Sequence, residues 1–156
     1  MAALTSDRNT EYSLGDLLSL PVAASTRIFA GSLVCVDGDG NAVPAADTSG
    51  LLIAGVATAQ ADNRNGAAGD RSVVVRRRGR YKFGYNGTLA QAAVGAQVYA
   101  VDDQTVDVAD GVSNNVAVGV IDRVESAGEC WVSIDGAVLA GRAWSEPVTT
   151  TTTAGA

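Results

Sequence analysis

Short runs of aliphatic residues, separated by glycine, aspartate and asparagine, cover the chain from residue 32 to residue 138. Runs of this length that are rich in valine and bounded by turn-forming residues are typical of β-strands. The predicted strands are residues 32–36, 52–59, 71–83, 96–101, 105–109, 115–125 and 130–138. Regularly spaced short strands predict an all-β protein, with a small β-sandwich or barrel formed by residues 27–144.

The apolar pattern of the first half recurs in the second half. The segment GSLVCVDGDGNAV, which begins at Gly31, aligns with GAQVYAVDDQTVDV, which begins at Gly95. Three pairs of positions match along the two halves: Val34 with Val98, Gly55 with Gly119, and Gly69 with Gly128. We therefore expect an internal duplication with half-repeats at about residues 31–78 and 95–138, although β-rich sequence of low complexity also aligns easily with itself. One barrel or two would fit this pattern.

The two ends of the chain differ from the middle. Residues 1–26 are polar at first, and then leucines recur at helical spacing until Pro21, which limits any helix to one or two turns. We expect an N-terminal arm here, which either covers the protein's own core or docks on another subunit as an apolar hook. Residues 145–156 are rich in threonine and are predicted to form a flexible tail. Trp144, just before them, is expected to anchor the C-terminal segment on a neighbour or on the domain itself.

The stretch DGDGN, residues 37–41, has the alternating oxygen side chains of a calcium-binding loop. Such a loop needs glycine at its sixth position and glutamate at its twelfth, counted from Asp37. Those positions hold Ala42 and Thr48, so both requirements fail. Asp-Gly and Gly-Asn pairs tolerate the backbone of tight hairpin turns, so we interpret this stretch as a hairpin tip with no metal.

Composition argues against catalysis. The chain of 156 residues contains no histidine, which removes Ser-His-Asp and Cys-His chemistry and the usual zinc or iron ligand. No glycine-rich phosphate loop precedes a helix, and no serine lies in a nucleophile-elbow pattern. We expect neither an enzyme nor a bound cofactor. Cys35 and Cys130 lie in apolar runs and are expected to be buried, reduced thiols, with a disulfide between them as the alternative.

The net charge of −6 makes a general nucleic-acid binder a poor expectation. The N-terminus has no basic-then-apolar signal pattern, and no apolar run approaches the roughly 18 residues of a membrane span. We therefore expect a soluble protein that is made in a cytoplasm and has no membrane partner.

The strongest local anomaly is the run VVVRRRGRYKF, which holds five of the eleven positive charges. In a strand, Arg76, Arg78 and Arg80 share one side until Gly79 bends the run. The patch could dock on an acidic protein surface, or it could be a solvated face that the protein's own carboxylates neutralise. Binding of nucleic acid is a third and weaker interpretation.

The order of motifs resembles the small capsid cement, or head decoration, proteins of tailed bacteriophages. The resemblance rests on "IAGVATA … GDRSVVVRR" and on "GAQVYAVDDQTVDVA … VAVGVIDRVESAGECWVSIDG". It covers residues 27–138, and the best match runs from Gly95 to Gly136. Its motifs are glycine and valine spacing rather than chemistry, and the arginine-rich run and the threonine-rich tail lie outside the pattern.

The resemblance implies a β-rich protein on the outer surface of a virion, synthesised in the host cytoplasm. It implies a homotrimer that clamps neighbouring major capsid proteins, with an arm that reaches along the shell. The hypothetical interface residues, to the capsid or to another subunit, are Leu14, Leu17, Leu18, Leu20, Arg76, Arg78, Arg80 and Trp144. The alternatives are a β-rich surface module that binds carbohydrate or another ligand, and a trimeric β-fold hydrolase acting on nucleotides.

Overall fold

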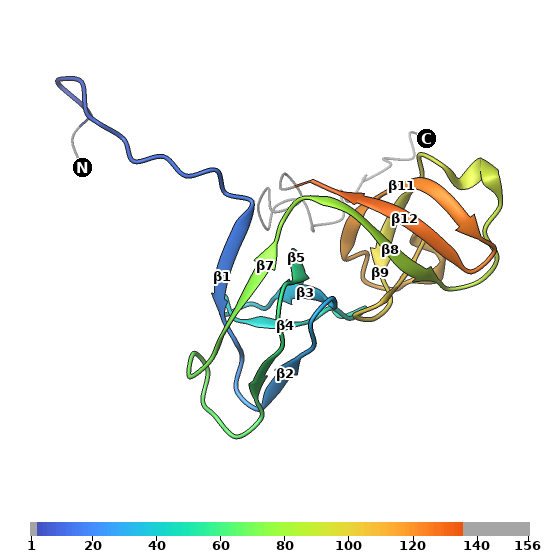
Figure 1. The fold of residues 1–156 in the computed structure, drawn as a ribbon, viewed down its shortest axis with the longest axis horizontal. Helices are drawn as coiled ribbons and strands as arrows, with labels where there is room; N and C mark the ends of the chain where they lie inside the picture. Colours follow the sequence, from blue (N-terminus) through green and yellow to red (C-terminus); the bar gives the residue numbers. More distant parts are fainter. Residues whose placement is uncertain (1–2, 136–156) are drawn as a thin grey trace, which may run out of the picture.

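The computed structural model describes residues 3–135, and strands dominate it. The all-β prediction, with a barrel, is confirmed. In this part of the chain the helical elements are two single 3₁₀ turns, η1 (Gln91–Ala93) and η2 (Ala109–Gly111). The strands form two units that lie side by side, and the chain passes from one to the other between β7 and β8 (Figure 1).

The first unit is a five-stranded sheet with the order β1-β7-β5-β3-β4. Its strands are β1 (Leu17–Pro21), β3 (Leu33–Val36), β4 (Ala42–Pro44), β5 (Leu52–Ala57) and β7 (Ser72–Arg76). The sheet curls until its two edges meet, because Val22 and Ala42 form a parallel bridge just beyond β1. The backbone N–H of Ala23 donates to the carbonyl of Ala42 at 3.0 Å. The unit is therefore a nearly closed barrel, and we call the junction between its edge strands β1 and β4 the seam.

The second unit is a closed barrel with the strand order β10-β8-β12-β11-β9. Its strands are β8 (Gly79–Tyr85), β9 (Gln97–Ala100), β10 (Thr105–Asp107), β11 (Ala117–Ser126) and β12 (Glu129–Ile134). A ring with an odd number of strands cannot alternate direction all the way round, so one neighbouring pair must be parallel. That pair is β10 and β8, while the other neighbours are antiparallel.

The internal repeat is visible in the strand pairing. The first strand of each unit pairs with the last, since Leu18 faces Val75 in the first unit and Tyr81 faces Val132 in the second. The seam also recurs: the parallel bridge between Val22 and Ala42 matches the parallel pair Tyr85 and Val106. Each unit therefore begins one strand earlier than the half-repeats aligned by sequence, with β1 in the first and β8 in the second.

Pro21 explains why the seam is narrower in the first unit. The matching residue of the second unit is Gly84, whose backbone N–H donates to the carbonyl of Gln104 at 3.0 Å. Proline has no backbone N–H and cannot make this bond. The first barrel therefore keeps one bridge at its seam, whereas the second has a two-residue parallel ladder.

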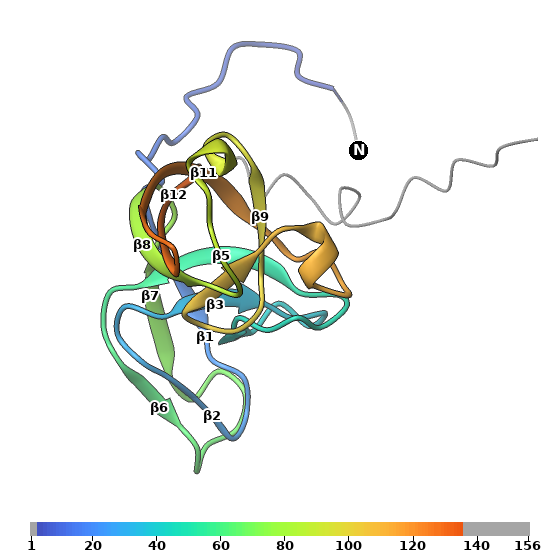
Figure 2. The same cartoon turned by 90° about the vertical axis from the view of Figure 1, so that its right-hand side faces the viewer.

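The N-terminal segment differs from the predicted arm of residues 1–26. Residues 17–21 form a strand rather than a helical turn, and Val22 is fully buried. Leu18 and Leu20 point inward and pack against the core of the first unit, so these two leucines are not available to a partner. Two short strands, β2 (Thr26–Ile28) and β6 (Ala61–Asn63), form a separate antiparallel ribbon beside the first unit (Figure 2).

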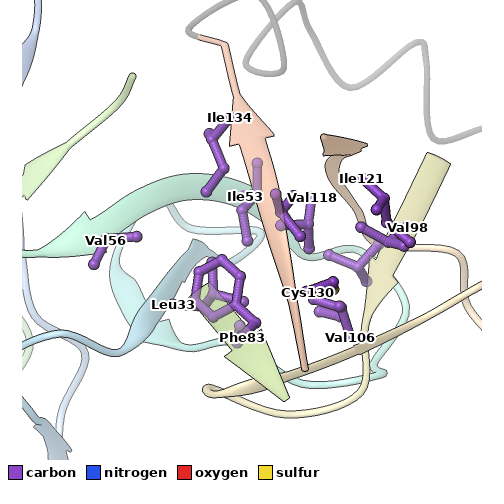
Figure 3. Close-up of a cluster of buried hydrophobic side chains, with 14 of the residues drawn as sticks. Leu33, Ile53, Val56, Phe83, Val98, Val106, Val118, Ile121, Cys130 and Ile134 are labelled. Carbon is purple, nitrogen blue, oxygen red and sulfur yellow. The ribbon is translucent and has the colours of Figure 1, made fainter. Parts of the chain in front are cut away.

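The first unit supplies side chains to the core of the second. Leu33 and Ile53, from β3 and β5, lie in the same buried cluster as Phe83 and Val118 of the second barrel (Figure 3). Cys35 and Cys130 belong to this cluster and are free thiols, as expected; burial raises the pKa of Cys35 to about 12. The two units are therefore held together by a common apolar core.

Asp47 ties the two units together at the surface. Its carboxylate accepts hydrogen bonds from the backbone N–H groups of Ser113 and Asn114, at 2.7 and 2.8 Å. These bonds, the one from Ser113 first, lower the pKa of Asp47 from its usual 3.8. A carboxylate with a lowered pKa in the folded state contributes stability above its unfolded pKa and loses it as the pH falls through the folded value.

We expect Asp47→Asn to lower the free energy of unfolding by about 1 kcal/mol at pH 7, because a charge-assisted bond to each backbone N–H is lost. The difference between the two proteins should shrink as the pH falls below the usual pKa of 3.8, because Asp47 then becomes protonated first in the unfolded chain and, at lower pH, in the folded chain. Urea unfolding at pH 7 and at pH 3 measures both values. A difference that stays constant over this range would show that the charge of Asp47 contributes nothing.

Candidate interaction surface

The arginine-rich run is divided between the two units. β7 ends at Arg76 and β8 begins at Gly79, whose φ of +126° is a conformation that other residues rarely adopt. The hydroxyl of Tyr81 donates to the carbonyl of Arg78 at 2.9 Å and holds this bend. Because the chain turns here, Arg76 and Arg80 lie on different barrels rather than on one continuous strand face.

On the second unit, the charges of the outer face are paired with each other. Arg80 forms an ion pair with Asp122 on β11, and Lys82 lies 3.6 Å from Glu129 on β12. On the same face Arg123 pairs with Glu125 at 3.0 Å, and the indole N–H of Trp131 donates to Glu125 at 3.0 Å. For this part of the run, the geometry agrees with a solvated face that the protein's own carboxylates neutralise.

Arg78 lies between these regions. Its guanidinium lies 3.9 Å from the carboxylates of both Asp16 and Asp135, and all three side chains are largely exposed. Exposed pairs at this distance contribute little to stability, typically about 0–1 kcal/mol. Arg78 is therefore partly neutralised and is a weak candidate for a docking residue.

Arg76 has different surroundings on the outer face of the first unit. No carboxylate among residues 3–135 lies within the 4.0 Å ion-pair distance of its guanidinium. It pairs across the strands with Leu17, which is 55% exposed, and Val74 beside it is 39% exposed. We call the residues of this region the first-unit face: Leu17, Ser19, Thr58, Val74 and Arg76.

A small hollow of about 210 Å³ lies at one side of the first-unit face. Its walls are Val56, Thr58, Arg76 and Tyr81. The hollow is smaller than the roughly 300–1,000 Å³ of most small-molecule pockets, so it suits a single side chain better than a metabolite. Desolvation raises the pKa of Tyr81, and the nearby charge of Arg76 partly offsets the effect.

Residues 3–14 extend away from the body of the protein, and we call them the free arm (Figure 1). Every side chain of the free arm is exposed, including Leu4, Tyr12 and Leu14 at 71%, 86% and 75%. Gly15, at a φ of +70°, separates it from Asp16, whose carbonyl accepts the N–H of Arg77 at 2.9 Å. The free arm therefore presents large apolar side chains without using them in its own fold.

Two other features of the described chain are held by local hydrogen bonds: a hollow beside the β6–β7 loop and the β3–β4 turn. A polar hollow of about 640 Å³ lies beside the β6–β7 loop, where the amide of Asn63 donates to three backbone carbonyls and Asp62 pairs with Arg64 at 2.7 Å. At the β3–β4 turn, Asp37 accepts the N–H groups of Asp39 and Asn41, both at 2.9 Å, which confirms the hairpin tip. Within residues 3–135 no group of three or more His, Cys, Asp and Glu side chains could hold a metal ion.

The structure brings together only part of the site predicted from sequence. Leu17 and Arg76 are neighbours on the first-unit face, and Leu14 precedes them on the free arm. Leu18 and Leu20 point into the core, Arg80 is paired internally, and Trp144 lies outside the described residues. Val74 and Thr58 were not predicted from the sequence. Val74 lies between two other valines, and only the structure shows that it is exposed while Val73 and Val75 are buried.

A scan of the chain against protein-family models matches none, and a search of the curated proteins finds no match. No helix in the described part of the chain is long and apolar enough to cross a bilayer.

Proposed function

We propose that the protein is a capsid decoration protein, which binds the outside of a phage head and stabilises contacts between major capsid proteins. The observation that carries the proposal is the free arm with its exposed leucines and tyrosine, joined directly to the first-unit face, where exposed apolar side chains surround the charge of Arg76. An unused arm beside an apolar surface suits a protein that becomes fully ordered on a partner.

The sequence resemblance to cement proteins supports the same proposal. The described part of its best match, residues 95–135, contains β9 to β12 and forms most of the closed barrel. The glycine and valine spacing therefore marks one structural unit, in which Gly119 is needed for close packing of β11 on β12. The first unit repeats this architecture and adds the free arm.

A decoration protein gains affinity by repetition. Copies that associate with each other and also bind a symmetric shell engage several weak contacts at once, which raises overall affinity without any single strong site. A homotrimer fits the threefold positions of such a shell. The major capsid protein and a second copy of this chain are the proposed partners.

Co-sedimentation with phage heads tests the proposal. We expect purified protein to bind heads assembled without it, to saturate at a fixed ratio to the major capsid protein, and to raise the temperature at which the heads open. Arg76→Ala should lower head occupancy several-fold at moderate salt, because no carboxylate of residues 3–135 pairs with Arg76. Arg80→Ala is the matched control and should bind normally, because Arg80 is paired with Asp122.

Binding that never saturates, or heads that open at an unchanged temperature, would contradict the proposed role. Equal loss of occupancy in the Arg76 and Arg80 variants would mean that overall charge, and not the first-unit face, governs binding. Affinity for an immobilised glycan array with no affinity for heads would favour the surface-module alternative.

A further inference from the structure

The two units offer an internal comparison, because the same architecture presents two different outer faces. The strand pairing matches four residues of the first-unit face with residues of the second unit: Leu17 with Arg80, Ser19 with Lys82, Val74 with Trp131, and Arg76 with Ser133. Thr58 follows Ala57, whose counterpart is Ile121, so Thr58 corresponds in chain order to Asp122. The second unit therefore has a charged face at positions where the first unit has neutral side chains and one arginine.

This difference shows which face is suited to water. In the second unit the charged side chains pair with each other across β8, β11 and β12, as a solvated sheet surface requires. In the first unit, Leu17 and Val74 remain exposed and the charge of Arg76 is not balanced within the described chain. Exposed apolar side chains around an unbalanced charge mark a surface that another chain covers.

The free arm has the properties that this face requires of its partner. Tyr12 and Leu14 are two residues apart, so in an extended chain they point to the same side. Their apolar side chains match Leu17 and Val74, and the hollow beside Arg76 has room for one large side chain. The free arm also carries two carboxylates, Asp7 and Glu11, against one arginine, which complements the positive charge of Arg76.

Geometry favours the arm of another copy over the arm of the same chain. The free arm leaves β1 at the end of the first-unit face and points away from it (Figure 1). Twelve extended residues span up to about 40 Å, which is more than the distance across a small domain. The arm can therefore reach a neighbouring molecule without any change in the body of the protein.

We propose that the free arm of one copy of this protein binds the first-unit face of a second copy, with Tyr12 and Leu14 on Leu17 and Val74, and an arm carboxylate near Arg76. The contact is heterologous, because the arm and the face are different surfaces. Heterologous contacts close into a ring, in which each copy gives one arm and receives one, when the rotation from one copy to the next closes. On the head, the arm and the face would serve this contact between copies, and Arg76→Ala would lower occupancy by separating the copies. The inference does not require a capsid, so it is tested without heads and stands or fails separately from the proposed function.

Mixing two variants tests this contact. One variant lacks residues 3–14 and keeps the face; the other, Val74→Asp with Arg76→Glu, keeps the arm. We expect the full chain to form a closed oligomer by sedimentation equilibrium in the range of about 10–100 μM, and each variant alone to be a monomer. The mixture should form a 1:1 heterodimer and nothing larger, because it contains one intact arm and one intact face.

Val120→Asp is the matched control. Val120 is 43% exposed on the second unit, comparable to Val74, and should tolerate the same substitution with no effect on the oligomer. Circular dichroism verifies that every variant keeps its β-sheet spectrum. A monomeric full chain, an oligomer that survives in the face variant, or a mixture that stays monomeric would each overturn the inference. Loss of head binding with the oligomer intact would instead count against the proposed function alone.

Discussion

A chain that lacks residues 1–24 is expected to fail to fold. The truncation removes β1, which pairs with β7 along its whole length, and with it the fully buried Val22 and the half-buried Leu18 and Leu20. Burial of one large aliphatic side chain contributes about 1.5–3 kcal/mol. Loss of three such side chains and of a strand ladder is comparable to the total stability of a domain, about 5–15 kcal/mol. Because β3 and β5 of the first unit also supply Leu33 and Ile53 to the core of the second barrel, unfolding of the first unit should cost the second barrel packing as well.

Deletion of residues 3–14 is the matched control, because this segment is fully exposed and lies before the first strand. We expect the shorter deletion to leave the β-sheet spectrum and the cooperative melt unchanged, while the longer one yields insoluble protein or a spectrum without β-structure. Circular dichroism and differential scanning fluorimetry of both chains measure this. A folded protein without residues 1–24 would mean that β1 is dispensable.

Alanine at position 55 or at position 119 is expected to lower the free energy of unfolding by about 2–4 kcal/mol. The two glycines are matched in the repeat, and each lies where another strand passes closely. A Cβ atom on Gly55 would overlap the carbonyl oxygen of Arg76, and one on Gly119 would overlap that of Ser133. Both oxygens belong to the backbone of a neighbouring strand, so neither can move without loss of strand pairing. Gly55 also has a φ of +148°, which alanine rarely adopts.

Gly128→Ala separates this steric effect from a general intolerance of substitution. Gly128 lies in the turn before β12, where an added Cβ would meet no atom within 4 Å. The change should alter stability by less than about 0.5 kcal/mol. Urea unfolding of the three variants gives the comparison. Equal stability of the Gly55, Gly119 and Gly128 variants would show that the strands can separate to accept a methyl group.

Much of the fold could be predicted from the sequence, because many of its strands are short aliphatic runs bounded by turn-forming residues. β5, β9 and β11 overlap the predicted segments, and all-β architecture follows from them. The run from residue 71 to residue 83 was predicted as one strand, and Gly79 divides it into two strands on different units. Strand-forming residues continue on both sides of the bend, so only the glycine signalled the break.

Three of the errors in the sequence-based prediction have a physical cause. β2, β4 and β6 have three residues each, too few for a period to show. Leu14, Leu17 and Leu18 suggest a helix, whereas Leu18 and Leu20 also have the two-residue period of the strand that forms. The alignment of the halves matched Val73 with Val132, but the pairing matches Val75 with Val132. A shift of two residues keeps every side chain on the same face, so the pattern could not detect it.

The candidate site was less predictable because it depends on partners that are distant in sequence. Arg76 and Arg80 are four residues apart and look alike in the sequence, but Asp122 neutralises only Arg80. The exposure of Leu17 follows from its register with Arg76 on β7, which local periodicity does not contain. Pairing between strands, rather than composition, therefore separates the docking candidate from the solvated face.

The two units are stacked repeats: the first packs on the second, and the second has no equivalent apolar surface on which a third could pack. The first unit packs Leu33, Cys35 and Ile53 of its β3 and β5 into the core of the second barrel. The matching positions of the second unit are Gln97, Tyr99 and Ala117, and none of them is buried. A third unit would therefore have no buried apolar positions to pack against. The terminal repeats of solenoid proteins likewise have a polar outer face, on which no further repeat packs. Growth by stacking thus stops at two, and assembly with other chains must use a different surface.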